Sequence, residues 1–315
     1  MTSRCRIEAL VLGIALLTVV QSGCAAVTNA DGPVYLFSTF KEPEQDGLRF
    51  AYSFDGYHWT NGPGLFLKPK VGSGIMRDPS VLRGPDGTFH VVWTTAWRGD
   101  QGFGYAQSKD LVRWSEPAFI PVMTNEPTTV NVWAPELFYD ETGNQFIICW
   151  ASTIPGRYPD DLEPHEKNHR MYCTTTTDFK TFTPTRLFFE PGFSVIDCQI
   201  LQDGGRYVLL LKDSTRPQLN LRVAFGDTPF GPWKDISAPF TRQFTEGPSA
   251  LKIGDDWLIY YDAYRDRKYG AVRTRDFKTF TDVTSEMVFP VGLKHGTAFK
   301  ASREDLGRVL HAGER

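Results

Sequence analysis

Short apolar runs, alternating or continuous, fill the chain from Asp31 onward, and Gly, Pro, Asp or Asn closes each of them. Runs of this length are typical of β-strands, because alternate side chains of a strand face opposite sides and turns need unusual backbone angles. Several runs directly follow such a turn, which predicts hairpins whose second strands are residues 89–93, 145–150, 207–211 and 257–261. No segment of useful length has the 3.6-residue apolar period of a helix.

An ionisable residue stands at or near the head of a small or apolar run at five places in the chain. The intervals between these residues are 58, 61, 49 and 49 positions, and the residues are Asp78, Glu136, Asp197, Glu246 and His295. Self-similarity at a nearly fixed period is the mark of a repeat architecture. The pattern therefore predicts five structural repeats.

A second repeat has the same period. It consists of a Ser or Thr, an Asp, and an aromatic residue four positions after the Asp, and its copies centre on Asp55, Asp110, Asp178 and Asp276, with a looser one at Asp227. About four strands per repeat of roughly 50 to 60 residues, with an aromatic turn signature, indicate the blades of an all-β, five-bladed β-propeller.

The two ends of the repeat region complement each other. The N-terminal strands, residues 34–37 and 48–52, lack an inner strand with a polar head, and the strand at 296–301 lacks partners. We therefore expect the N-terminal strands to join the C-terminal inner strand and close the ring, which removes its exposed edges. The propeller would span residues 33–302, with residues 303–315 as a C-terminal tail.

The N-terminus has the pattern of an export signal. Arg4 and Arg6 precede an apolar run at 9–20, which is too short to span a bilayer, and small residues follow. We expect a signal peptide at 1–24 and a linker at 25–32. Gly23-Cys24 resembles a bacterial lipobox, although Gln21 stands where that motif has an aliphatic residue. The pattern predicts an extracytoplasmic bacterial protein: periplasmic, secreted, or anchored at the cell surface by a lipid on Cys24.

Composition and charge narrow the function. The 34 Lys and Arg against 37 Asp and Glu give a net charge of −3 without a basic block, which argues against nucleic acid and anionic membranes as partners. Cys149, Cys173 and Cys198 remain after the signal region, and an odd number favours buried free thiols over a disulfide framework. We expect a monomer.

The five polar heads should surround one pocket, because the inner strands of a propeller run beside its axis. The loops after each second strand open on the same face, since that strand runs antiparallel to the inner one. Aromatic walls with carboxylates suit a sugar, and the residues expected there are Arg77, Trp97, Trp133, Tyr158, Arg216, Tyr264 and Arg265.

Paired carboxyl groups across such a pocket suit inverting glycoside hydrolysis, in which one protonates the leaving oxygen and the other activates water. A third carboxylate can raise the pKa of the acid by repulsion. The alternative is that the acids hold turns by accepting backbone hydrogen bonds. The acidic loop at 154–169 also contains His165 and His169, but its irregular spacing favours a solvated loop over a metal site.

The ordered motifs Arg-Asp-Pro-Ser, Trp-Ala-Pro-Glu, Ile-Asp, Glu-Gly-Pro and Lys-His-Gly resemble those of glycoside hydrolase family 43 over residues 33–301. The resemblance implies Asp78 as general base, Asp197 as pKa modulator and Glu246 as general acid. It places His295 near the axis, where many members hold a water-coordinated calcium or sodium ion; a satisfied histidine without an ion is equally open. Glu136 and Cys198 depart from the residues common in the family, and Glu136 puts the substrate in doubt.

The resemblance implies an inverting, exo-acting hydrolase that needs no cofactor and removes α-L-arabinofuranosyl or β-D-xylosyl residues. An exo-β-galactosidase of the same family is an alternative, and related folds include fructosidases and mannoside phosphorylases. A surface propeller that binds glycans without cleaving them is the non-enzymatic alternative, and loss of one of the three acids would indicate it.

Overall fold

The computed structural model describes residues 32–158 and 168–312. The chain separates into two compact units, residues 1–32 and 33–315, and the fold described below is that of the second. The expected signal peptide, Cys24, all but the last residue of the linker, and most of the acidic loop lie outside the described residues.

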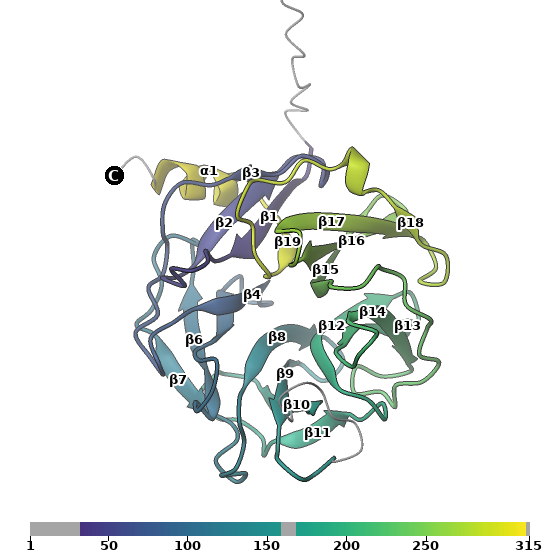
Figure 1. The fold of residues 1–315 in the computed structure, drawn as a ribbon. Helices are drawn as coiled ribbons and strands as arrows, with labels where there is room; N and C mark the ends of the chain where they lie inside the picture. Colours follow the sequence, from purple (N-terminus) through teal and green to yellow (C-terminus); the bar gives the residue numbers. More distant parts are fainter. Residues whose placement is uncertain (1–31, 159–167, 313–315) are drawn as a thin grey trace, which may run out of the picture. The chain divides into compact units, whose positions relative to one another are not determined.

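Five antiparallel sheets surround a common centre, each with one strand nearest the axis (Figure 1). The first two sheets in the chain are β4 (Arg77–Arg83), β5 (Phe89–Thr94), β6 (Gly102–Ser108), β7 (Ala118–Pro121), and β8 (Trp133–Asp140), β9 (Gln145–Thr153), β10 (His169–Thr176), β11 (Arg186–Phe189). The next two are β12 (Val195–Asp203), β13 (Arg206–Asp213), β14 (Asn220–Gly226), and β15 (Glu246–Ile253), β16 (Asp256–Ala263), β17 (Lys268–Thr274), β18 (Thr281–Asp282). The fifth is β19 (Ala298–Ala301), β1 (Val34–Thr39), β2 (Arg49–Ser53) and β3 (Thr60–Asn61). We refer to each sheet as a blade, named by its inner strand.

The ring closes as expected. β1 pairs antiparallel with β19, with Val34 opposite Ala301 and Phe37 opposite Ala298, and on its other side with β2. The five-bladed β-propeller and its closure by the N-terminal strands are therefore confirmed.

Two details differ from the sequence-based expectation. The β12 blade has three strands, because residues after β14 pair irregularly with it, through Lys234 against Phe225 and the Ser237 N–H to the Val223 carbonyl. The expected C-terminal tail contains a helix, α1 (Arg303–Ala312). Ser302 and Asp305 cap its first turn reciprocally, since each side chain accepts the backbone N–H of the other. A short 3₁₀ helix, η1 (Thr284–Glu286), follows β18.

The apolar core of the described residues consists of five clusters, one between each pair of neighbouring blades. Leu36 of β1 packs toward the β4 blade with Leu306 and Val309 of α1, and Phe37, the next residue, packs toward the β15 blade. Because successive side chains of a strand point to opposite faces, one strand contributes to two of the seams.

The second sequence repeat forms turns. The Asp110 carboxylate accepts the N–H groups of Val112 and Arg113, while Ser108 Oγ accepts that of Leu111. Asp55, Asp178 and Asp276 make the same two Asp-centred bonds at their own turns. The Asp in each of these four copies therefore stabilises a turn, whereas at the looser copy Thr228, next to Asp227, makes the turn bonds.

Cys149, Cys173 and Cys198 are buried free thiols, as expected, with Cys149 and Cys173 directly opposite each other on β9 and β10. Within residues 32–158 and 168–312, no helix has both the length and the apolar character needed to cross a membrane.

Candidate active site

A β-bulge near the head of four inner strands positions the candidate site. The pairing of β4, β8, β12 and β15 with their second strands shifts between residues 77 and 80, 133 and 136, 196 and 199, and 246 and 249. One bulge residue in each has a left-handed backbone, with φ of 50° at Asp78, 46° at Ala134, 52° at Asp197 and 58° at Gly247. Bulges of this kind redirect side chains and often lie beside functional sites.

His295 holds the same position in the fifth blade. The Ser80 side chain accepts the Leu137 N–H of the next inner strand, and the Ser249 side chain accepts the Ala298 N–H in the same way. Glu136 and Thr297, each one residue before the donor, therefore occupy equivalent positions in their strands, and so does Ser249. His295, two residues before Thr297, therefore corresponds to the bulge residues of the other blades. We call these five positions the bulge ring: Asp78, Ala134, Asp197, Gly247 and His295.

The four acids and the histidine predicted from the sequence are thus not all equivalent. Glu246 stands one residue before its bulge position, and Glu136 stands two residues after Ala134. Glu136 lies one layer below the bulge ring, where Gln199 and Thr297 donate hydrogen bonds of 3.2 and 3.1 Å to its carboxylate. Burial raises the pKa of Glu136 to about 7, against the opposing effect of the hydrogen bond from Ser80. Its carboxylate therefore belongs to the axial packing rather than to the pocket wall.

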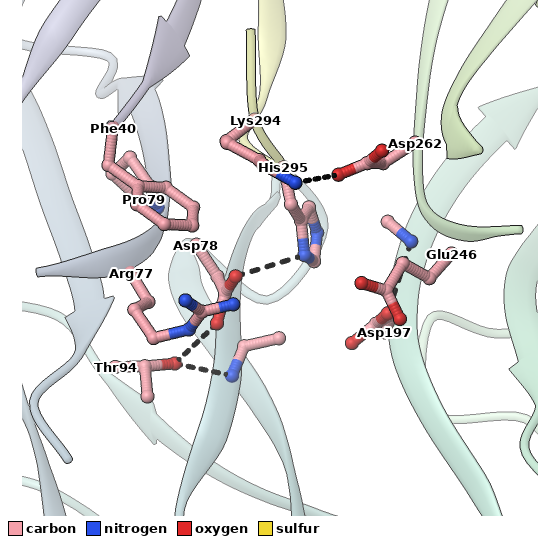
Figure 2. Close-up of polar contacts among 12 residues, drawn as sticks. Phe40, Arg77, Asp78, Pro79, Thr94, Asp197, Glu246, Asp262, Lys294 and His295 are labelled. Carbon is pink, nitrogen blue, oxygen red and sulfur yellow. Dashed lines mark hydrogen bonds and ion pairs between the residues drawn. The ribbon is translucent and has the colours of Figure 1, made fainter. Parts of the chain in front are cut away.

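The pocket at the head of the inner strands has a volume of about 100 Å³. Its lining comes from all five blades and consists of Arg77, Asp78, Thr94, Trp97, Trp133, Ile196, Asp197, Glu246 and His295. Asp78 lies on one side, Asp197 and Glu246 on the other, and His295 between them (Figure 2). The three acids expected to carry the chemistry therefore share one pocket.

Asp78 is held by two neighbours. Thr94 Oγ1 donates to its Oδ2 at 2.9 Å and His295 Nδ1 lies 3.3 Å from its Oδ1 (Figure 2). Burial opposes ionisation, but the hydrogen bond and charge of His295 outweigh it and lower the pKa of Asp78. Thr94 Oγ1 also accepts the Ala134 N–H at 2.8 Å, which fixes the hydroxyl. Asp78 is consequently ionised and oriented at neutral pH.

His295 is a cation in this setting. Burial opposes its protonation, but the charge of Asp197 and the bond to Asp78 raise the pKa of His295 to about 9. A protonated imidazole has no free lone pair for a metal, and it repels a cation beside it. Among the described residues, no group of three or more His, Cys, Asp or Glu side chains could hold a metal ion. These donors do not fit a directly coordinated ion, and a water-coordinated one stays a prediction.

Asp197 and Glu246 lie together near one buried cation, Lys212. Asp197 accepts the Gly247 N–H at 3.1 Å, and burial, followed by repulsion from Glu246, raises the pKa of Asp197 although His295 opposes this. Lys212 Nζ lies 2.7 Å from Glu246 Oε2, and Lys212 is 4% exposed. Of the three acids in the pocket, Glu246, across from Asp78, is the one with a direct lysine contact.

A chain of ion pairs lies beside the pocket, near the blade that closes the ring. Lys294 Nζ lies 3.1 Å from both Asp262 and Glu42, and Glu42 also pairs with Arg77. Burial raises the pKa of Asp262 to about 6, against the charge of Lys294. The Arg77 guanidinium lies over the Trp97 ring, 3.9 Å from its centroid. The chain links residues of three blades beside the candidate base.

Of the remaining residues expected to contact the sugar, Trp97 and Trp133 line the pocket, and Tyr264 and Arg265 do not. Trp97 is 52% exposed at the pocket, and the Trp133 indole donates to its carbonyl. Tyr264 packs over Lys212, whose Nζ lies 4.9 Å from the ring centroid, and Arg265 lies over Phe244, 3.6 Å from the centroid. Tyr264 and Arg265 thus flank the Glu246 side without lining the pocket itself.

Sequence reasoning missed Thr94, Lys212 and Asp262. Each lies at or one residue before the end of a second strand and pairs across the sheet with the residue preceding a bulge position: Arg77, Ile196 and Glu246. The available signal was a polar residue closing an otherwise apolar strand, just before a loop expected to face the pocket.

Comparison with known proteins agrees with this fold. A solved α-L-arabinanase from Cellvibrio cellulosa superposes with a TM-score of 0.58 at 15% identity, over 84% of this chain and 96% of that one. An exo-β-1,3-galactanase from Phanerochaete chrysosporium superposes with a TM-score of 0.52 at 14% identity, over 70% and 53%. At these identities the likeness concerns the fold.

Sequence relatives point the same way. An α-L-arabinofuranosidase of Bifidobacterium longum subsp. longum is 24% identical over 61% of this chain, a match that spans 20% of the relative's length. The family model for domains related to glycoside hydrolase family 43, described as "Probable glycosyl hydrolase domain", matches residues 32–306. Since this match includes every blade and all three pocket acids, the chain belongs to the glycoside hydrolase 43-related family.

Proposed function

We propose that the protein is an inverting, exo-acting glycoside hydrolase that removes α-L-arabinofuranosyl or β-D-xylosyl residues from plant-type polysaccharides or oligosaccharides. The observation that carries the proposal is the placement of Asp78 and Glu246 on opposite sides of one small pocket (Figure 2). Inversion requires two carboxyl groups that flank the glycosidic bond with room for a water molecule between one of them and the sugar.

Asp78 has the properties of the base. Its lowered pKa keeps it ionised, and its two hydrogen-bond partners fix the orientation of the carboxylate. In the proposed reaction, Asp78 accepts a proton from a water molecule as that water attacks the anomeric carbon.

Glu246 would donate the proton to the departing oxygen. Burial and repulsion from Glu246 raise the pKa of Asp197 beside it, so Asp197 keeps its proton to higher pH than an ordinary aspartate does. Asp197 therefore acts through Glu246, as a modulator of its protonation.

Pocket size supports exo action. A volume of about 100 Å³ is well below the roughly 300–1,000 Å³ of typical ligand pockets, and it suits one terminal sugar ring better than the interior of a polymer. Trp97 at the mouth offers an aromatic face for the adjoining unit.

The first test is turnover of aryl α-L-arabinofuranoside, β-D-xyloside and β-D-galactoside, with the anomer of the product followed by NMR. Asp78→Asn and Glu246→Gln should each reduce turnover of a cleaved substrate by roughly 10²–10⁴-fold, since each removes one proton-transfer group. Glu116→Gln, at an exposed surface acid paired with Lys70, is the matched control. Near-normal rates in both pocket variants, or a retained anomeric configuration, would refute the proposed mechanism.

The same experiment separates the alternatives. Preferential cleavage of the galactoside would identify the galactan-acting alternative, and a requirement for added phosphate would identify phosphorolysis. Binding of arabinan, xylan or galactan fragments without cleavage would identify a glycan-binding propeller.

A further inference from the structure

Lys212 has no role in the reaction as proposed above, yet it is a buried cation in direct contact with the proposed acid, Glu246. It projects from β13 of the β12 blade and reaches Glu246 at the head of β15, in the next blade. Its Nζ lies 2.7 Å from Glu246 Oε2 and 4.9 Å from the Tyr264 ring centroid, and the side chain is almost fully removed from solvent.

A buried lysine needs a compensating negative charge, because transfer of an ammonium from water is costly. Here burial disfavours the charged form of Lys212, but Glu246 and then Asp197 outweigh it and raise the pKa of the lysine. Lys212 is therefore charged throughout the range in which a glycosidase works, and it acts as a fixed positive charge.

The contact is specific to one oxygen of Glu246. Lys212 Nζ donates to Oε2, which leaves Oε1 free of this contact. Among the described residues, Lys212 is the cation in direct contact with this carboxylate. Other titratable groups face Glu246 from five elements, namely Asp197 (β12), Asp262 (β16), Tyr264 (after β16), Tyr269 (β17) and His295 (before β19).

We propose that Lys212 is a positioning residue for the general acid. It holds Glu246 by Oε2 so that Oε1 carries the transferable proton, and its charge sets the upper pH limit of turnover. The inference rests on the proposed function, because it assigns Glu246 the acid role.

Removing the charge should extend activity to higher pH. A neighbouring cation favours the ionised form of a carboxyl group, so without Lys212 the proton of Glu246 is retained as pH rises. In Lys212→Gln, which keeps a hydrogen-bond donor but not the charge, and in Lys212→Met, the alkaline limb of kcat/KM should move up by at least about one pH unit. Lys212→Arg should keep the limb near that of the wild type.

Lys252→Met is the matched control. Lys252 also lies over an aromatic ring, 5.5 Å from the Trp257 centroid, but it is 51% exposed and pairs with Asp203 at 3.8 Å, away from the pocket lining. Its loss should leave the alkaline limb in place. Thermal unfolding of every variant identifies those that fold.

A readout without catalysis separates this inference from the proposed function. The full chain is labelled with ¹³C at the glutamate δ-carbons, Glu246→Gln identifies the Glu246 signal, and its titration is followed by NMR. The signal should titrate at higher pH in Lys212→Gln and Lys212→Met than in the wild type and Lys212→Arg. An unchanged titration in folded Lys212→Gln or Lys212→Met would overturn the role of Lys212. A normal shift with no hydrolysis of any glycoside would overturn the proposed function and leave the electrostatic role intact.

Discussion

At the scale of single residues, the pocket is an arrangement of three carboxyl groups around two buried cations. His295 faces Asp78 and Lys212 faces Glu246, so each candidate proton-transfer group has its own positive neighbour. Among the described residues, Asp197 forms no ion pair with a cation, and burial raises its pKa. The surroundings thus shift the pKa values of two like groups, Asp78 and Asp197, in opposite directions.

His295 makes stability depend on pH in a defined window. The pKa of His295 rises from about 6.5 in the unfolded chain to about 9 in the folded one, so the folded state binds the proton more tightly. Its contribution is fully present below about pH 6.5 and is lost as pH rises through about 9, and it is on the order of 3 kcal/mol.

We therefore expect the free energy of unfolding of the wild type to fall more steeply than that of His295→Gln between pH 7.5 and 9.5. Urea unfolding at several pH values measures this. Glu136 and Asp262 titrate lower, near pH 7 and 6, so they contribute little in the chosen window. His311→Gln on α1 serves as the exposed control, and parallel curves for wild type and His295→Gln would contradict the expectation.

At the scale of elements, the bulges determine which residues face the pocket. Gly247 has φ of 58°, and a Cβ there would lie 2.6 Å from His295 Cγ. Gly254, in the turn at the other end of β15, has φ of 60° with no atom within 4 Å of its added Cβ. Comparing alanine substitutions at these two glycines therefore separates the effect of the contact with His295 from the strain of a left-handed backbone.

Gly247→Ala and Gly254→Ala should both lose roughly 1–2 kcal/mol of stability from backbone strain. Gly247→Ala should lose more and should also lower turnover, because His295, which contacts Asp78, would have to shift. Urea unfolding and kcat of the two variants give the comparison. Equal losses of stability with equal turnover would show that the site tolerates displacement of His295.

The bulges also explain what the sequence could and could not predict. Hairpins, blades and ring closure follow from apolar runs and turn residues, and these were read correctly. The predicted equivalence of the five polar heads is wrong, because the acid in each repeat can stand before, in or after the bulge, as Glu246, Asp78 and Glu136 do. A change of one residue moves a side chain to the other face of the strand.

Helix α1 shows a different limit. Ser302 and Asp305 form a readable cap, and Leu306, Val309 and Leu310 have helical spacing, but the segment is short and strongly charged. Its stability comes from packing against the β19 and β4 blades rather than from propensity, and tertiary contacts of this kind are not visible in a local pattern.

At the scale of the whole propeller, every seam between blades depends on the ring being closed. Side chains of the layer below the bulge ring accept N–H groups of the next inner strand at Leu137, Ala250 and Ala298. At the closing seam, Ser38 Oγ donates to the Pro79 carbonyl at 2.5 Å and accepts the Thr297 N–H at 2.9 Å. The residues directly below the pocket therefore also form the hydrogen bonds that join neighbouring blades.

Deleting residues 33–67 removes β1 to β3 and should abolish cooperative unfolding. β19 would lose its partner strand, and two of the five apolar clusters would lose one wall, since Leu36 and Phe37 serve the seams on either side. An open ring exposes strand edges and apolar surface together, so the remaining blades cannot hold the pocket residues in register. Urea unfolding followed by near-ultraviolet circular dichroism tests this against a chain beginning at residue 32. A truncated protein that unfolds in one sharp transition would mean that four blades are stable alone. Closure of the ring by β1 would then not be needed for stability.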